Sequence, residues 1–311
     1  FITVTGQAKG AYIRSVVPTP NIVTVKQRHS FVELPDDDYT PREFDSRAGY
    51  MSISFMDFAS PIDEQIVKKF IARHRLIKKQ PHLEISEPVD PIIYYLDRGT
   101  PEPVRSALIE GGNWWNEAFE YAGFKNAFRV EVAPEGMDLL DVRYNAIQWV
   151  HRSTRGWSYG ASVKDPRTGE IIKGHVSLGS LRVRQDYLIA QGLLQPFKTD
   201  DSGDERMLQM ALARLRQLSA HEIGHTLGLS HNFSSSASGR SSVMDYPHPL
   251  ITGDNDDLNF DIAYDTKIGA WDKWAIKYGY GYPSVNSNEK NFLQTTLERT
   301  LEDGYEFISD A

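Results

Sequence analysis

One stretch limits the fold and the chemistry of this chain more than any other: residues 221–231 read His-Glu-Ile-Gly-His-Thr-Leu-Gly-Leu-Ser-His. His221 and His225 are four residues apart, so both side chains project from the same face of an α-helix. Two neutral imidazoles placed in this way can reach one Zn²⁺, whose bonds to nitrogen are about 2.0–2.1 Å long. Glu222 lies beside them and can deprotonate a water molecule activated by the metal.

The residues after His225 predict a third ligand. Gly228 can enter the left-handed conformation without strain, so we expect the helix to end there. The chain then turns and returns His231 toward the first two histidines. Three histidines, an open coordination position and an adjacent carboxylate are typical of a hydrolytic zinc site. The alternative is a buried helix that carries these groups without a metal, which would leave unpaired polar atoms at a high cost.

The composition excludes several other classes of function. With 311 residues the chain can form one large or two moderate domains. Its formal net charge of −8 argues against a nucleic-acid partner, since such proteins usually carry a basic face. No apolar run approaches the ~20 residues of a membrane span. The absence of cysteine excludes thiol nucleophiles and cysteine-based latency within these residues and identifies no compartment. Because the chain begins at Phe1 without a signal peptide, we expect a mature or truncated piece of a longer protein.

Residues 1–85 are predicted to form a β-rich accessory or pro-like region. Short β-prone runs alternate there with glycines and prolines, at residues 2–5, 11–17, 22–27, 30–33 and 49–58. The segment Pro61–Lys79 is expected to be a helix, because Ile62, Ile66 and Phe70 form a helical stripe. Nothing in this region carries recognisable chemistry, and Asp36–Asp38 is interpreted as a turn.

From Pro91 onward the pattern is one of alternating strands and helices, which predicts an α+β or α/β domain over residues 86–311. The expected strands are Ile92–Leu96, Phe128–Ala133, one within Leu140–Val150, and a hairpin of Ser158–Lys164 with Glu170–Ser177. The expected helices are Glu102–Ala122, Leu181–Gln191, Met207–Leu227, Asp265–Tyr278 and Glu289–Glu302, with a flexible exposed loop at Ser234–Gly239. This order implies a mostly parallel, twisted sheet of about five strands with one antiparallel strand at its edge.

The motif at residues 221–231, followed by Ser-Val-Met-Asp-Tyr at residues 242–246, resembles the metzincin clan of zinc metalloendopeptidases. The sheet and long helix before the motif agree with that clan, and so does the hairpin turn Asp165–Glu170. The chain as a whole is similar to secreted bacterial zinc-dependent metalloproteases with an N-terminal accessory domain. The resemblance implies an upper subdomain over residues 86–231, a lower subdomain over residues 232–311, and a secreted or cell-envelope location.

The resemblance also implies a role for each residue of the motif. His221, His225 and His231 would coordinate one catalytic Zn²⁺, and Glu222 would act as general base and then carry the proton to the leaving amine. Gly228 would shape the turn, and Met244 would lie in a tight Met-turn beneath the metal as an apolar floor. Tyr246 would either ligate zinc and hydrogen-bond the oxyanion or simply pack beside Pro247. Asn232, directly after the third histidine, matches no residue that marks the best-known members of the clan.

These features predict a zinc-dependent endopeptidase that binds an extended protein or peptide substrate along the edge strand Ser158–Lys164. Two alternatives stay open: a zinc-containing binding or adhesion module without turnover, and a latent precursor in which residues 1–85 cover the cleft, with a carboxylate such as Asp45. Other metal candidates are His151 and His175, and, for Ca²⁺, Asp200–Glu205 and Asp254–Asp257. Co²⁺ or Mn²⁺ could occupy the same three imidazoles. Cleavage preference and oligomeric state do not follow from the sequence.

Overall fold

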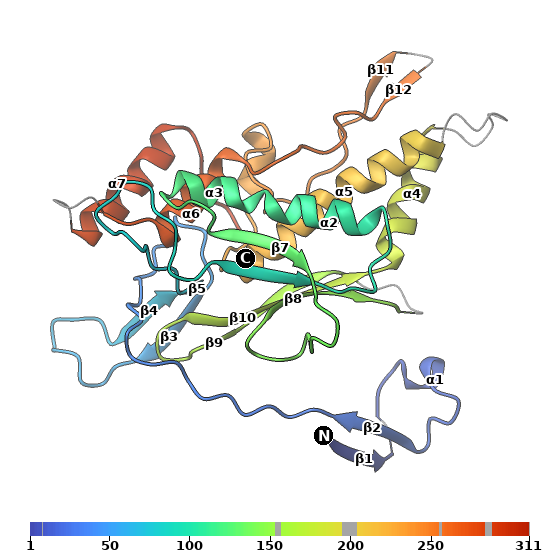
Figure 1. Ribbon diagram of the computed structural model, residues 1–311, viewed down its shortest axis with the longest axis horizontal. Coiled ribbons are helices and arrows are strands. Elements are labelled where there is room, and N and C mark those ends of the chain that lie inside the picture. Colours follow the sequence, from blue (N-terminus) through green and yellow to red (C-terminus); the bar gives the residue numbers. More distant parts are fainter. Residues whose placement is uncertain (8, 153–156, 195–203, 255–256, 284–287, 311) are drawn as a thin grey trace. The chain divides into compact units, whose positions relative to one another are not determined.

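The structure is a computed structural model that describes residues 1–7, 9–152, 157–194, 204–254, 257–283 and 288–310 (Figure 1). Its contacts define two compact units, Phe1–Pro35 and Asp36–Ala311. The first unit contains an antiparallel hairpin, β1 (Ile2–Gly6) with β2 (Val23–Gln27), and a short helix, α1 (Ile13–Val16). The β-rich character predicted for the N-terminal region is confirmed, but the strand expected at residues 11–17 is wrong because α1 lies there.

A six-stranded sheet forms the centre of the second unit. Its strands lie in the order β5-β10-β8-β6-β7, and β9 pairs with β10. The bounds are β5 (Arg73–His74), β6 (Ile92–Leu96), β7 (Phe128–Val132), β8 (Asn145–Val150), β9 (Tyr159–Lys164) and β10 (Glu170–Gly179). All neighbours are parallel except β9 and β10, which are antiparallel. The predicted mixed sheet with one antiparallel hairpin strand is therefore confirmed.

Helices cover one face of this sheet (Figure 1). They include α2 (Val104–Asn113), α3 (Trp115–Tyr121) and the 23-residue α5 (Asp204–Thr226). The single helix expected at Glu102–Ala122 is divided at Trp114, whose amide donates to the carbonyl oxygen of Gly111, three residues earlier, so the regular spacing of four residues is interrupted there. Next to this break, the side chain of Asn113 accepts a hydrogen bond from the amide of Val130 in β7. The other helices are α4 (Leu181–Leu194), α6 (Ala270–Tyr280) and α7 (Glu289–Glu302). The long helix predicted to carry the first two histidines is confirmed as α5.

The helix expected at Pro61–Lys79 is wrong. Its second half forms β4 (Val67–Ile71), which pairs antiparallel with β3 (Ser52–Met56), and then β5. Ile62, the first residue of the expected apolar stripe, is fully exposed. Without burial of that stripe a helix gains little stability, whereas β4 satisfies its backbone groups by pairing with β3.

Residues 36–85 contribute to the same core as the rest of the second unit. Tyr50, Ile71 and Leu76 are buried in one cluster with the hydrophobic residues of the sheet and of α5. The hydroxyl of Tyr50 donates to the carbonyl oxygen of Ala275 in α6 at 2.9 Å. The division by contacts thus lies at Pro35, whereas the boundary predicted from the sequence lies at residue 85. A separate role for residues 1–85 stays a prediction.

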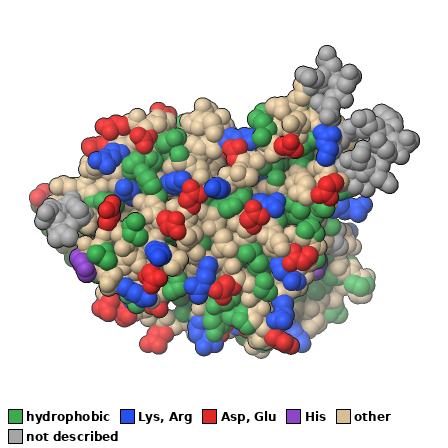
Figure 2. All heavy atoms as spheres, turned by 45° about the horizontal axis from the view of Figure 1, so that its top comes forward, with side chains coloured by type: hydrophobic (Ala, Val, Ile, Leu, Met, Phe, Trp, Pro, Cys, Tyr) green, Lys and Arg blue, Asp and Glu red, His purple; other side chains and the backbone are tan. Residues whose placement is uncertain are grey.

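Helix hydrophobicity and the distribution of surface charge bear on whether the protein binds a membrane or a charged partner. Within the described residues, no helix combines the length and the apolar character that crossing a bilayer requires. On the face drawn in Figure 2, acidic and basic side chains are interspersed rather than gathered by sign. A small hairpin of β11 (Thr252–Asp254) and β12 (Asp257–Asn259) completes the described strands.

Candidate metal centre

The last turns of α5 place His221 and His225 on one helical face, and Gly228 brings the third histidine back to them. Gly228 has a φ of +106°, a conformation that residues with a side chain rarely adopt. A Cβ at this position would lie 1.9 Å from the carbonyl oxygen of Ala72. The expected helix end at Gly228 is confirmed, and the turn returns His231 to the end of α5.

The three histidines converge on one point. Their candidate ligand atoms all lie within 4.8 Å of one another. The Nε2 atoms of His225 and His231 are 3.1 Å apart. Two imidazole nitrogens bound tetrahedrally to one Zn²⁺ would be about 3.3 Å apart, given bonds of about 2.0–2.1 Å. The side chains therefore lie close to the arrangement that zinc requires.

The hydrogen bonds of the rings leave Nε2 available in all three histidines. Nδ1 of His221 donates to the carbonyl oxygen of Val243, and Nδ1 of His225 donates to that of Leu229, each at 2.8 Å. A carbonyl oxygen only accepts, so both Nδ1 atoms carry the proton and both Nε2 atoms carry a lone pair. Nδ1 of His231 lies 2.6 Å from Oδ2 of Asp310.

Burial keeps two of the imidazoles neutral. It lowers the pKa of His225 to about 4 and that of His221 well below its ordinary value. His225 and His231 also lower the pKa of His221, and His231 lowers that of His225, since a second positive charge nearby is unfavourable. Neutral imidazole is the form that binds metal, so the donor set fits Zn²⁺.

Glu222, next to the first ligand, is almost fully buried. Burial raises its pKa to about 7, while the positive charge of Arg214 and the backbone N–H of Gly160 oppose the rise. A carboxyl group whose pKa lies near neutrality can both accept and return a proton. The sequence alone did not indicate Arg214, which precedes Glu222 by about two helical turns.

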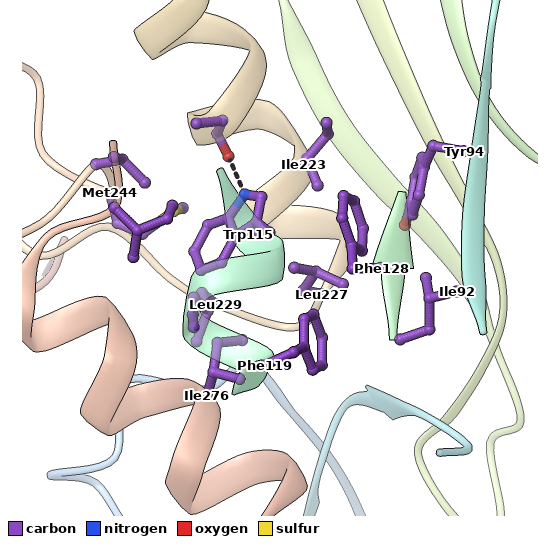
Figure 3. Packing of buried hydrophobic residues seen from close by; sticks show 14 of the residues in the cluster. Ile92, Tyr94, Trp115, Phe119, Phe128, Ile223, Leu227, Leu229, Met244 and Ile276 are labelled. Atoms are coloured by element: carbon purple, nitrogen blue, oxygen red, sulfur yellow. Dashed lines mark hydrogen bonds between the residues drawn. The ribbon is translucent and has the colours of Figure 1, made fainter. Parts of the chain in front are cut away.

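Met244 packs against α5 in the middle of the histidine motif. Its side chain is fully buried, and Figure 3 shows it beside Trp115. A Cβ added at Gly224, in the middle of the motif, would lie 2.2 Å from Sδ of Met244. The indole nitrogen of Trp115 donates to the carbonyl oxygen of Ala220 at 2.8 Å, so α3 and Met244 support the same part of α5 (Figure 3).

Asp272, a buried residue of α6, holds the turn that contains Met244. Its carboxylate accepts hydrogen bonds from the hydroxyl of Ser242 (2.6 Å), the amide of Val243 (2.8 Å) and the amide of Gly269 (2.9 Å). Asp272 was not predicted as a site residue, because the helix was expected to begin at Asp265. The true start follows Gly269, and an acidic third residue after a helix N-cap is the signal that could have found it.

The segment after the third histidine differs from the expected flexible loop. Residues Phe233–Ala237 form a 3₁₀-helix, and Ser235 is buried. The hydroxyls of Ser235 and Ser236 both donate to the carboxylate of Asp245, beside Met244. Serines that seemed to mark a solvated loop instead tie this segment to the Met244 turn.

Tyr246 lies against the metal centre. Its ring centroid is 4.4 Å from that of His231 and 5.3 Å from that of His221. The residue is 56% exposed. Partial burial raises the pKa of Tyr246, and the negative charges of Glu222 and Asp310 raise it further, so its hydroxyl keeps its proton near neutral pH. A proton donor thus lies next to the histidines on a partly open side.

The edge strand β9 lies along α5. A Cβ at Gly160 would be 2.1 Å from the carbonyl oxygen of Glu222 and 3.0 Å from Cβ of His225, so only glycine permits this approach. Along β9, exposed and partly buried residues alternate. The strand predicted to bind substrate is therefore adjacent to the histidines.

The other metal candidates are not part of this centre. Among the described residues, His221, His225 and His231 are the one group of three or more potential ligands gathered around a common point. Nδ1 of His151 instead lies 2.9 Å from the hydroxyl of Ser180, and Asp45 pairs with Arg47 at 2.7 Å. His175 lies on β10. Both candidate Ca²⁺ segments, Asp200–Glu205 and Asp254–Asp257, fall largely outside the described residues.

Comparison with known proteins identifies part of the chain. Residues 203–311 match a family model described as Met-zincin, and residues 1–79 match one described as a domain of unknown function. No curated protein and no solved structure matched the chain. The three histidines fit the zinc-binding motif of the Met-zincin family, which supports a function of the metalloprotease type with zinc as the metal. Residues 203–311, which hold the whole metal centre, therefore form a Met-zincin domain.

Proposed function

We propose that this protein is a zinc-dependent endopeptidase that hydrolyses peptide bonds in protein or peptide substrates. One observation carries the proposal: the ligand atoms of three imidazoles gather within 4.8 Å of one another, with the buried carboxyl group of Glu222 next to them. A purely structural zinc site has four protein ligands and no use for a base, whereas a catalytic site has three and keeps one position open.

The metal and the residues around it each have a separate role in the proposed reaction. Zn²⁺ bound there would polarise the scissile carbonyl and lower the pKa of a water molecule. Glu222 takes a proton from the attacking water and returns it to the leaving amine, which its pKa of about 7 suits in both directions. Tyr246, whose ring lies against two of the histidines, donates a hydrogen bond from its hydroxyl to the developing oxyanion.

The substrate lies in an extended conformation along β9. This strand pairs with β10 on one side, so the backbone groups on its other side can pair with an added peptide strand. Main-chain pairing depends little on the side chains of the substrate, and it brings the scissile bond over α5 because Gly160 holds β9 close to Glu222.

Cleavage of a fluorogenic peptide library tests the proposal. The wild type is compared with Glu222→Ala and with the control Glu205→Ala, which removes an exposed carboxylate from the far end of α5. Zinc content is measured on all three proteins. We expect zinc in all three, cleavage by the wild type and the control, and loss of cleavage by Glu222→Ala or after chelation.

Other outcomes would favour the alternatives. Zinc-loaded wild type that cleaves nothing across a broad library would favour a binding module without turnover. Cleavage that appears only after residues 1–35 are removed would favour a latent precursor. Equal cleavage by Glu222→Ala would remove Glu222 from the mechanism.

The secreted or cell-envelope location is a further part of the proposal and rests on the resemblance alone. Fractionation of cells that express the natural gene, followed by immunoblotting, tests it. Protein found only in the cytoplasmic fraction would contradict it.

A further inference from the structure

Asn232, the residue after the third histidine, binds a segment far away in the sequence. It is completely buried, and its side-chain amide donates to the carbonyl oxygen of Glu306 at 3.0 Å. Its side-chain oxygen accepts from the amide of Ile308 at 3.2 Å and from the hydroxyl of Ser234 at 2.7 Å. A buried amide with both ends engaged fixes the path of the segment that it binds.

Further contacts hold the same segment, residues 305–310. The amide of Phe233 donates to the carbonyl oxygen of Ile308 at 2.8 Å, so the backbone directly after Asn232 also binds the segment. The ring of Phe307 stacks on Trp271 of α6, with ring centroids 5.7 Å apart and planes inclined by 10°. The segment is therefore anchored both to the loop after His231 and to the helix that supports the Met244 turn.

This anchored segment places Asp310 on the third histidine. Oδ2 of Asp310 lies 2.6 Å from Nδ1 of His231, the ring nitrogen on the side away from the other histidines. The ring of His221 is instead oriented by the carbonyl oxygen of Val243 in the Met244 turn. The ring of His225 is oriented by the carbonyl oxygen of Leu229, four residues later. For His231 the corresponding acceptor is a carboxylate, which makes the stronger, charge-assisted hydrogen bond.

We propose that Asp310 is a positioning residue for the metal centre. It holds the proton of His231 on Nδ1 and fixes the orientation of the ring, so that Nε2 faces the metal and becomes a better donor. Asn232 binds the segment and thereby holds Asp310 next to His231. This gives a function to Asn232, for which no role could be predicted from the sequence. The inference rests on the proposed metal centre, but it concerns metal binding and does not depend on turnover.

Zinc affinity of the full chain tests the proposal. The dissociation constant is measured by competition with a chromophoric chelator for the wild type, Asp310→Ala and Asp310→Glu. The control Glu302→Ala removes another exposed carboxylate of the C-terminal region, near the end of α7. We expect Asp310→Ala to weaken zinc binding about tenfold, the lower end of the usual range for an outer-shell carboxylate because Asp310 is exposed. Asp310→Glu should recover part of the loss, and the control should bind as the wild type does.

The absorption spectrum of the Co²⁺-substituted proteins provides a second readout. A changed His231 donor alters the d–d bands, so we expect Asp310→Ala to differ from the wild type and Glu302→Ala to match it. Because Asp310 lies at the surface, its variants should fold. Circular dichroism of each variant checks this expectation. A zinc dissociation constant for Asp310→Ala within twofold of the wild type, with an unchanged Co²⁺ spectrum, would overturn the proposal.

Asn232→Ala tests independently whether Asn232 affects zinc binding through Asp310. If Asn232 acts by carrying Asp310, then Asn232→Ala weakens zinc binding and Asp310→Ala adds little to it in the double variant. Fully additive losses in the double variant would contradict this link. A wild type that binds zinc tightly and cleaves no peptide would contradict the proposed endopeptidase function. The zinc dissociation constants of the variants would still test the role of Asp310 in that case.

Discussion

Nδ1 of His221 donates a 2.8 Å hydrogen bond to the carbonyl oxygen of Val243, which joins the active-site helix to the Met244 turn. The amide of the same residue, Val243, donates to the buried carboxyl group of Asp272 in α6. A continuous chain of hydrogen bonds thus joins His221 to the Met244 turn and the turn to α6. The orientation of a metal ligand depends on such partners, and their loss is felt in metal affinity or activity.

The pH dependence of stability should show the contribution of Asp272. Burial raises its pKa to about 7, although its three hydrogen bonds oppose the rise, whereas in the unfolded chain the pKa is close to 3.8. Between these two values the folded state holds a proton that the unfolded state has lost, so the free energy of unfolding falls as the pH rises from about 4 to 7. Above pH 7 this contribution is constant.

Comparison with Asp272→Asn isolates the effect, because the amide cannot ionise. Urea denaturation of both proteins at pH 5, 6, 7 and 8 should show the wild type losing roughly 2–3 kcal/mol relative to the variant between pH 5 and 7. The difference between the two proteins should change little from pH 7 to 8. A constant difference from pH 5 to 8 would show that the carboxyl group is ionised throughout.

Substitution of Gly228 should damage both the fold and the metal centre. Gly228→Ala places a Cβ in a left-handed conformation and 1.9 Å from the carbonyl oxygen of Ala72, so we expect a loss of about 3 kcal/mol and a displaced His231. Gly136 has a similar φ of +78° but no atom within 4 Å of an added Cβ, so Gly136→Ala is the matched control and should cost about 1 kcal/mol. Chemical denaturation and zinc stoichiometry measure the two effects. Equal losses in both variants would show that the turn adapts.

Tyr246→Phe should separate metal binding from turnover. The ring of Tyr246 lies against His221 and His231, whose Nδ1 atoms bond to Val243 and Asp310, so we expect retained zinc and a kcat reduced by about 10–1000-fold, with a smaller change in KM. Tyr95→Phe, on β6 of the sheet, is the control for loss of a hydroxyl elsewhere. An unchanged kcat would show that Tyr246 only packs beside the metal centre, and a loss of zinc would show that it is a ligand.

The metal centre and the sheet could be predicted because both depend on local patterns. The spacing of His221 and His225 needs only a helix, and Gly228 alone explains the turn that returns His231. The alternation of strands and helices from Pro91 onward leaves few arrangements other than a mostly parallel sheet. Each element can therefore be recognised from residues that are close in the sequence, although the strand order β5-β10-β8-β6-β7 joins distant segments.

The errors occurred where distant residues decide the structure. The segment expected as a helix at Pro61–Lys79 becomes strands because β3 and β10 pair with it, which no local pattern shows. Asp272 and Asp310 follow the histidines by many residues, and only the folded chain brings them to the Met244 turn and to His231. Serines after Asn232 indicated a solvated loop because their acceptor, Asp245, lies on another segment.

Removal of N-terminal residues should distinguish the two possible domain boundaries. None of the described residues before Tyr39 is buried, whereas Tyr50 and Ile71 lie in the main core. A chain that begins at Asp36 should therefore unfold cooperatively and bind zinc as the full chain does. A chain that begins at Ser86 loses several large buried side chains, each worth about 2–5 kcal/mol, and this exceeds much of the 5–15 kcal/mol that stabilises a typical domain. Thermal unfolding followed by circular dichroism, together with zinc stoichiometry, compares the three proteins; a cooperatively folded, zinc-binding chain from Ser86 would instead support an independent region over residues 1–85.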